Sequence, residues 1–232
     1  MPHGPLTLPL VVFAAVVLLA FLYICYVLWP RWPGPPIGPD APALPITVAG
    51  VAFNVPPAAI RVRVQRRPGA HERVDLAFLW PSLAPPDPGV KAPPPPAPAP
   101  GAPPAPTQTL DRIFVTIASA ADTLDPAERV LNIYPRYAEV EAVAGPDGLA
   151  LLPFKDGTPY QGEDLLYDPT APGFIVRCTR NGAGPTPGTC LYERRIEAAD
   201  LVVRFPRDWL GDWRNVAGKI DGLITRLRPR NP

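Results

Sequence analysis

The sequence predicts one N-terminal transmembrane helix followed by a β-rich soluble domain of the α+β type, a β-sandwich or rolled sheet closed by a C-terminal amphipathic helix. Three patterns along the 232 residues predict this fold class. An uncharged apolar run occupies residues 6–29, later runs alternate apolar and polar residues, and an apolar stripe at helical spacing ends the chain. Alternation with a period of two is typical of half-buried strands, whereas steps of three and four are typical of helices.

The apolar run is long enough to span a bilayer as a helix, for which about 20 residues suffice. A cleaved signal peptide is the main alternative, but its apolar part is shorter and ends at a small-residue cleavage site, which is missing here. Four aromatic residues suited to the membrane interface cluster at the C-terminal end of the run: Tyr23, Tyr26, Trp29 and Trp32. We therefore expect a retained membrane anchor behind a short head, residues 1–5.

The orientation of this anchor is subject to two opposing signals. Basic residues follow the run, beginning with Arg31, and the enrichment of Lys and Arg on cytoplasmic sides weakly favours a cytoplasmic domain. However, Cys178 and Cys190 flank a turn-rich loop between two strand-like runs, which favours a disulfide, and hence an oxidising compartment, over two unrelated buried residues or a metal-binding pair. A long soluble part also crosses a membrane largely regardless of its charge. We expect an anchor in a bacterial inner membrane and a periplasmic domain.

Proline accounts for 38 residues and concentrates in residues 30–45 and 84–106. Such runs adopt extended polyproline II and act as semi-rigid spacers, although the second run could also serve as a ligand for a proline-binding domain. We expect a stalk after the membrane helix and an insertion within one domain formed by residues 46–83 and 107–232. One domain is expected because the roughly 35 residues before the insertion make too small a core alone.

Strands are expected on both sides of the insertion. In order, they are residues 46–55, 60–64, 73–80, 112–119, 174–180, 190–196 and 201–205. Residues 73–80 illustrate the pattern, with four apolar side chains on one face: Val74, Leu76, Phe78 and Trp80. Asp125 can cap a short helix that starts at Pro126. A hairpin is expected over residues 140–154, with its turn at Pro146-Asp147-Gly148, and residues 156–173 are expected to be turns.

The last expected element is a helix over residues 208–227, with Asp208 as its N-cap. Its apolar stripe consists of Trp209, Trp213, Val216, Ile220, Leu223 and Leu227. Such a stripe most often packs against a sheet, because an exposed sheet face needs covering. The alternatives are a helix on a membrane surface and a partner-binding face on which Trp209 and Trp213 are the anchors.

The sequence contains few of the residues that usually carry out catalysis. Only Ser82 and Ser119 could serve as serine nucleophiles, and neither lies in a nucleophile-elbow motif. We expect no metal site and no cofactor, because two histidines and one cysteine pair make a four-ligand zinc site difficult to assemble. Glu163 and Asp164 could form the carboxylate pair of a cell-wall hydrolase, but adjacent acidic residues in a loop are usually just solvated.

Arginines on successive strands make a better case for binding. The candidates for contact with a partner are Arg177, Arg194, Arg195 and Arg204, because guanidinium groups recognise carboxylates and phosphates. The alternative is that nearby acidic residues neutralise them in surface ion pairs of little energetic value. The net charge of +1 and the lack of a basic stripe argue against a nucleic-acid partner.

We therefore expect a single-pass, membrane-anchored envelope protein that is not an enzyme. It would act as a subunit or scaffold that presents its domain to another envelope or membrane protein. A binding module for anionic envelope polymers or lipid head groups is the second hypothesis, and the cell-wall hydrolase is the third. No small-molecule substrate is evident from the sequence.

Overall fold

The computed structural model describes residues 7–28, 37–87, 90, 111–120, 124–170, 173–183 and 186–229. They belong to two units, Met1–Pro36 and Ile37–Pro232, which are described separately. Some expectations lie outside the described residues, namely the head, Trp29, Trp32, the first part of the stalk and nearly all of the insertion.

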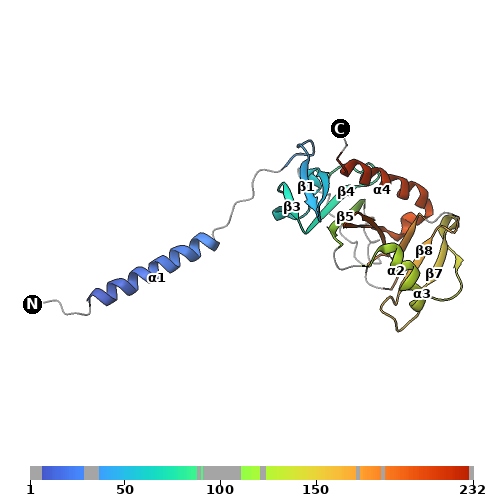
Figure 1. The fold of residues 1–232 in the computed structure, drawn as a ribbon, viewed down its shortest axis with the longest axis horizontal. Helices are drawn as coiled ribbons and strands as arrows, with labels where there is room; N and C mark the ends of the chain where they lie inside the picture. The colour runs from blue at the N-terminus through green and yellow to red at the C-terminus, as the bar shows by residue number, and fades with distance from the viewer. Residues whose placement is uncertain are drawn as a thin grey trace, which may run out of the picture. The chain divides into compact units, whose positions relative to one another are not determined.

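The described part of the first unit is one helix, α1 (Thr7–Leu28), which carries no charged residue (Figure 1). At a rise of 1.5 Å per residue, its 22 residues cover roughly 33 Å, close to the ~30 Å hydrocarbon core of a bilayer. Length and composition thus suit a membrane span, and a signal sequence near the N-terminus meets the same criteria. The retained anchor and the interfacial role of Tyr23 and Tyr26 stay predictions.

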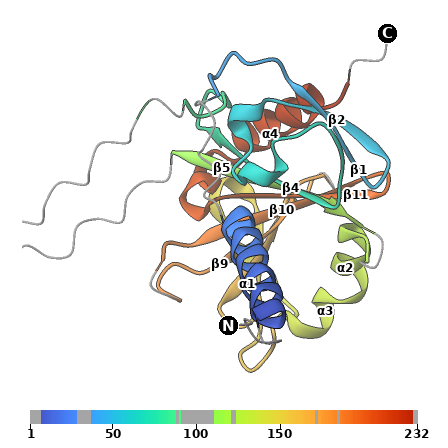
Figure 2. The ribbon, with the colours of Figure 1, turned by 90° about the vertical axis from the view of Figure 1, so that its left-hand side faces the viewer.

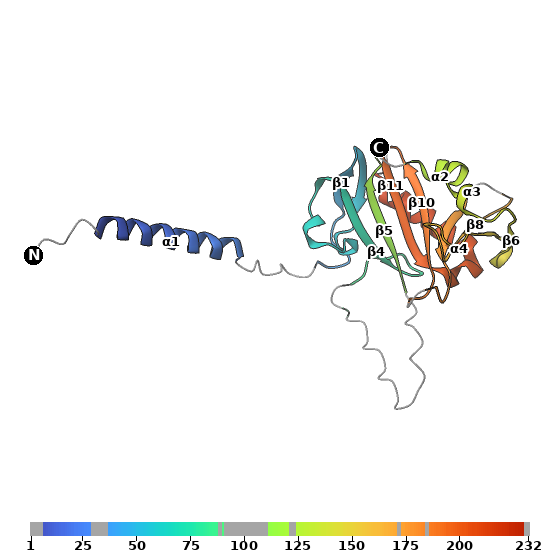
Figure 3. The same ribbon diagram turned by 90° about the horizontal axis from the view of Figure 1, so that it is seen from below.

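Two β-sheets form the framework of the second unit (Figure 3). The large sheet is antiparallel throughout, in the order β4 (Arg73–Leu79), β5 (Arg112–Ser119), β11 (Ala199–Pro206), β10 (Thr189–Ile196), β9 (Ile175–Thr179), β8 (Glu163–Tyr167), β7 (Ala150–Pro153) and β6 (Val143–Ala144). The small sheet has the order β2 (Val51–Val55), β1 (Leu44–Val48) and β3 (Gly69–His71), with β1 and β3 parallel. The predicted β-rich domain with a C-terminal helix is confirmed.

The main core lies between one face of the large sheet, the small sheet and the helix α4 (Trp213–Leu227). In β5, Ile113, Val115 and Ile117 are buried in this core, while Phe114 and Thr116 between them are half-exposed on the other face. The same alternation runs through β4 and β11. Figure 2 shows α4 and the strands β1 and β2 on one side of the large sheet, and two short helices on the other.

These short helices are α2 (Pro126–Asn132) and α3 (Tyr134–Tyr137). The Asp125 side chain caps α2 by accepting a hydrogen bond from the amide of Ala127, as predicted. Together with neighbouring strands, the helices enclose a smaller core built around Tyr134, Phe154 and Leu165. The second face of the large sheet is therefore covered at its β8–β10 end.

The cysteine hairpin is confirmed in detail. Cys178 on β9 pairs directly with Cys190 on β10, and the two residues form a disulfide with both side chains fully buried. The hairpin of β6 and β7 also forms, around a 3-10 turn η3 (Pro146–Gly148). The predicted strands at residues 73–80, 112–119 and 201–205 are present within a residue or two of their expected bounds.

Two strand predictions before the insertion need correction. The run 46–55 is a hairpin of two strands, because Ala49 and Gly50 both adopt positive φ angles of 49° and 83° and form a two-residue turn. The run 60–64 is wrong as a strand. Only Ile60 makes a bridge, to Leu76 of β4, and the chain then enters the 3-10 turn η2 (Arg63–Gln65).

Two predictions after the insertion also need correction. The segment 156–173 contains a full strand, β8, which pairs with β7 and β9. The C-terminal helix starts later than expected, since a 3-10 helix η4 (Arg207–Asp212) precedes α4. Asp208 does not cap the α-helix, because it lies in this 3-10 segment, where its carboxylate accepts a hydrogen bond from Asn181 at 3.1 Å.

Candidate functional site

The second face of the large sheet carries one continuous row of six side chains, which we call the open row. Its members occupy matched positions on β4, β5, β11, β10, β9 and β8: Ala77, Phe114, Arg204, Leu191, Arg177 and Leu165. Residues directly opposite each other in antiparallel strands point to the same face. The row therefore crosses most of the sheet on the side away from the main core. Both of its ends lie in hollows of the surface.

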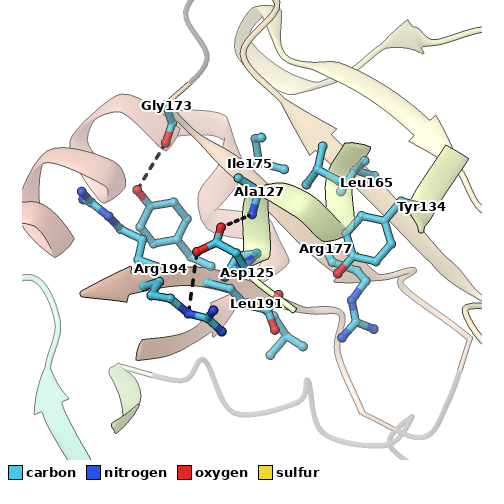
Figure 4. A pocket seen from close by; sticks show the side chains of 14 residues that line it. Asp125, Ala127, Tyr134, Leu165, Gly173, Ile175, Arg177, Leu191 and Arg194 are labelled. Carbon is cyan, nitrogen blue, oxygen red and sulfur yellow. Dashed lines mark hydrogen bonds and ion pairs between the residues drawn. The ribbon is translucent and has the colours of Figure 1, made fainter. Parts of the chain in front are cut away.

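The first hollow lies between α2 and the strands β8–β10, and we call it the helix-side cavity (Figure 4). It has a volume of about 230 Å³. The open row supplies Leu165, Arg177 and Leu191 to its lining, and α2 closes the opposite side with Val130. Asp125, Glu193 and Arg195 also line it, so its charges have both signs.

Ion pairs neutralise most charges around the helix-side cavity. Arg177 pairs with Glu163, and Arg129 of α2 pairs with Glu193 at 3.0 Å. Burial alone would lower the pKa of Arg177, but its hydrogen bond to Glu163 and the charge of that carboxylate raise it, so Arg177 stays charged. Within the described residues, the buried Nε atoms of Arg177 and Arg129 have no hydrogen-bond partner.

The hydroxyl of Tyr134 lies in the same electrostatic environment. Its pKa is raised, first by burial and then by the charge of Glu193, while Arg177 acts in the opposite direction. Tyr134 is therefore a neutral hydrogen-bonding group at all physiological pH values. It can orient a polar group but does not supply a base.

The second hollow lies at the other end of the open row, and we call it the basic groove. It has a volume of about 420 Å³ and is lined by Ala58, Ala59, Ile60, Arg61, Arg66, Ala77, Pro86, Arg112 and Phe114. The guanidinium carbon of Arg61 lies 4.6 Å from the ring centroid of Phe114. Nε of Arg66 donates to the carbonyl oxygen of Ile60 at 2.9 Å. Arg112 forms an ion pair with the exposed Asp111, at 3.4 Å between Nε and Oδ1.

The arginines expected to bind a partner fall into two groups. Arg194 pairs with Asp221 of α4, and Arg195 pairs with Asp200 at 2.7 Å. Arg177 pairs with Glu163, as described above. Arg204 differs from these three, because it is exposed at the centre of the open row and forms no ion pair with a described residue. The structure thus brings Arg177 and Arg204 onto one row and directs Arg194 toward α4.

The two tryptophans proposed as partner anchors pack within the protein. Trp213 is buried, stacks on Phe174 at a centroid distance of 4.9 Å and donates its indole N–H to the carbonyl of Asp147. Trp209 stacks on Trp80 at 4.5 Å. The expectation that the C-terminal stripe packs against the sheet is confirmed by the burial of α4.

Glu163 and Asp164 do not form a carboxylate pair. They are neighbours in β8, so their side chains point to opposite faces of the sheet. Glu163 pairs with Arg177 on one face, and the buried Asp164 pairs with Arg180 and Arg207 on the other. Neither carboxylate is placed to act with the other on one bond. Among the described residues, no group of histidines, cysteines and carboxylates is arranged to hold a metal ion.

The basic groove was missed in the sequence because its residues are far apart along the chain. Arg61 lies in the segment wrongly expected to be a strand, Arg66 follows that segment, and Arg112 begins a strand 51 residues after Arg61. One signal was present, however. The alternation of β5 places Arg112 and Phe114 on the face opposite to the buried isoleucines.

No protein-family model matches the sequence, and no curated protein matches it. The chain is similar in structure to Smlt3025, an immunity protein of the Stenotrophomonas maltophilia type IV secretion system, with a TM-score of 0.52 and 16% identity over 82% of this chain and 94% of that chain. It also resembles FrpD, an iron-regulated outer membrane lipoprotein of Neisseria meningitidis, with a TM-score of 0.38 and 11% identity over 82% of this chain and 96% of that one. The likeness to Smlt3025 shows a shared fold, and the score for FrpD carries no argument.

Proposed function

We propose that this chain is a membrane-anchored envelope protein whose non-catalytic domain binds a protein partner through the open row. The observation that carries the proposal is the row itself, which joins the helix-side cavity to the basic groove through the exposed Arg204. Protein interfaces are enriched in aromatic side chains and arginine. The row combines such groups with aliphatic side chains.

The dimensions of the open row favour a protein over a small molecule. Neighbouring strands lie about 4.8 Å apart, so the three intervals from Phe114 to Arg177, between the buried end members Ala77 and Leu165, span roughly 14 Å, and the two hollows extend this surface at both ends. A standard interface buries about 800 Å² on each partner, which corresponds to a patch roughly 30 Å across. A small-molecule site instead buries most of its ligand in one concavity. A partner that follows the row would use the two hollows as separate pockets.

The comparison with Smlt3025 supports a protein partner at the level of the fold. That protein is described as an immunity protein of a secretion system. By analogy, we propose that the partner of this chain is another protein of the envelope or of a secretion system. The distribution of ion pairs around Glu163 and Asp164 supports the non-catalytic part of the proposal.

We further propose that α1 anchors the chain in a bacterial inner membrane and that the domain is periplasmic. The disulfide of Cys178 and Cys190 supports an oxidising compartment. Intact spheroplasts that carry Cys25→Ala can be treated with a bulky, membrane-impermeant maleimide. Labelling of the two cysteines only after reduction is the expected result, whereas labelling that needs lysis but no reductant would place the domain in the cytoplasm.

Quantitative co-purification tests the binding proposal. The full chain is extracted from membranes of its native host, and co-purified proteins are compared between the wild type and the double variant Leu191→Glu/Arg204→Glu. The matched control is Arg136→Glu/Val140→Glu, which changes the charge equally at exposed positions of α3 and of the loop before β6. Loss of one protein with the first variant, and its retention with the control, is the expected result. If the wild type, the double variant and the control all recover the same co-purified proteins in equal amounts, the proposal is contradicted.

A further inference from the structure

We propose that the basic groove binds an acidic segment of the partner protein, with Asp or Glu side chains seated between Arg61, Arg66 and Arg112. This inference rests on the proposed protein-binding function and specifies the chemistry of one end of its surface. The partner is defined by a negatively charged segment that fits the basic groove.

The charge of the basic groove is of one sign. Its described lining contains three arginines and no acidic residue. The helix-side cavity differs, because Asp125 and Glu193 lie beside its arginines. An anionic group is therefore favoured at the groove end of the open row.

The arginines of the basic groove are held in position before any partner binds. The guanidinium of Arg61 stacks on the ring of Phe114, and the backbone amide of Arg61 donates a hydrogen bond to the carbonyl oxygen of Asp75 at 2.9 Å. Arg66 uses Nε for the carbonyl of Ile60, and its two terminal nitrogens make no hydrogen bond to a described residue. A guanidinium with free terminal nitrogens can bind a carboxylate through two parallel hydrogen bonds. Such preorganisation reduces the entropic cost of binding.

The open row extends this positive surface toward the centre of the sheet. Arg204 lies directly beside Phe114 across the β5–β11 pair. Neighbouring strands are about 4.8 Å apart, so Arg204 lies within reach of a segment seated in the groove. An acidic stretch of several residues is thus a better match than a single carboxylate.

The shape of the basic groove favours a peptide segment over a lipid surface. Peripheral membrane binding combines basic residues with apolar side chains that insert into the bilayer. Here the aromatic ring lies half-buried beneath Arg61, and the exposed Val62 and Val64 nearby do not line the groove, so its lining presents mainly guanidinium groups. Side chains that project from a polypeptide can enter a concave site that a flat head-group layer does not fill.

Fluorescence anisotropy with a fluorescein-labelled decaglutamate peptide tests the proposal directly. The full chain is used in uncharged detergent micelles, and the reversal variant is Arg61→Glu/Arg112→Glu. The matched control is Arg136→Glu/Arg226→Glu, which reverses two exposed arginines outside the groove. We expect the Kd for the peptide to rise at least tenfold with the reversal variant and to stay within twofold with the control. A similar change in both variants, or in neither, would overturn the proposal.

Two further measurements complete the experiment: one uses a variant with neutral side chains, and the other tests competition by lipid head groups. Arg61→Gln/Arg112→Gln should raise the Kd by an intermediate factor while the thermal unfolding midpoint stays unchanged, which separates lost binding from lost folding. The chain is also placed in nanodiscs of phosphatidylcholine with and without phosphatidylglycerol. Peptide binding that persists in both kinds of nanodisc supports a protein ligand. Abolition of binding by phosphatidylglycerol would instead assign the groove to lipid head groups.

The co-purification assay distinguishes failure of this inference from failure of the proposed function. If a partner is lost with Leu191→Glu/Arg204→Glu but retained with Arg61→Glu/Arg112→Glu, the function stands and the acidic-segment inference is wrong. If the wild type recovers no partner while decaglutamate binding depends on the groove, the protein-binding function fails and the anionic site remains.

Discussion

The carboxylate of Asp164 accepts a hydrogen bond from Arg207 at 2.6 Å, across a separation of 43 residues. A second arginine, Arg180, donates to the other oxygen of the same carboxylate at 2.7 Å. Asp164 is only 3% exposed, so this buried charge joins β8, the end of β9 and the start of η4. The residue that resembled a solvated loop carboxylate in the sequence is a central part of the fold.

Replacement of Asp164 by Asn is expected to lower the free energy of unfolding by about 3 kcal/mol, because the largely buried Arg207 and the partly exposed Arg180 lose their counter-charge. Urea denaturation at pH 7 measures this change. Asp156→Asn is the control, since Asp156 is exposed in a turn and forms no ion pair with a described residue. A loss below about 1 kcal/mol for Asp164→Asn would show that the network contributes little.

The disulfide is expected to stabilise the domain by about 2–3 kcal/mol, since it closes a short loop with a sequence separation of 12. Reductant should therefore shift the urea midpoint of the wild type downward. The variant Cys178→Ala/Cys190→Ala should unfold at this lower midpoint and no longer respond to reductant. A Cys25→Ala variant whose urea midpoint no longer responds to reductant would show that the reducible bond is a disulfide between the Cys25 residues of two chains.

The ionisation of Asp75 makes the stability of the folded domain depend on pH in the acidic range. Burial alone would raise the pKa of this carboxyl, but hydrogen bonds from Arg73, Thr116 and Gln65, together with the charge of Arg73, lower it below its usual value of 3.8. The resulting stabilisation is fully present above pH ~4 and is lost as the pH falls through the lowered folded-state pKa.

The variant Asp75→Asn should therefore be less stable than the wild type by about 1–2 kcal/mol at pH 7. The difference should shrink steadily between pH 4 and pH 2, as measured by thermal unfolding at several pH values. A difference that is constant over this range would mean that the ionised form of Asp75 has no special role.

Trp213 is expected to act through packing, not through contact with a partner. It is 6% exposed, so Trp213→Ala should cost about 3–5 kcal/mol of unfolding free energy. Trp213→Phe retains most of the packing and removes the hydrogen bond to Asp147, at a cost of about 1 kcal/mol. A folded, stable Trp213→Ala protein that loses its co-purified partner would return this residue to the list of binding anchors.

The alternation of apolar and polar residues predicted the strand β5 correctly but predicted a strand wrongly at residues 60–64. The two segments differ in whether neighbouring strands pair with them. β5 lies between β4 and β11, so both of its edges are paired and one face enters the core. After Ile60 the chain has no such partners, and Val62 and Val64 are 40% and 77% exposed. Alternation indicates that a segment can form a half-buried strand, whereas the presence of a neighbouring strand is a property of the whole fold.

The missed strand β8 and the missed basic groove have the same cause. The charges of Glu163 and Asp164 favoured a loop, because the arginines that neutralise Asp164 lie 16 and 43 residues further along the chain. Arg61 and Arg112 likewise line one groove only because Ile60 bridges to β4 and β4 pairs with β5. In contrast, the cysteine hairpin and the cap at Asp125 depend on local patterns and were predicted correctly.

Site-specific photo-crosslinking in intact cells tests the central claim most directly. A benzophenone amino acid is introduced at Arg204, in the middle of the open row, and at Val140 as a control that is 92% exposed outside both hollows. The account predicts one crosslinked protein adduct from Arg204, weakened by a Leu191→Glu substitution, and no such adduct from Val140. Adducts of equal yield from both positions, or adducts with lipid alone from Arg204, would contradict the claim that the open row binds a protein partner.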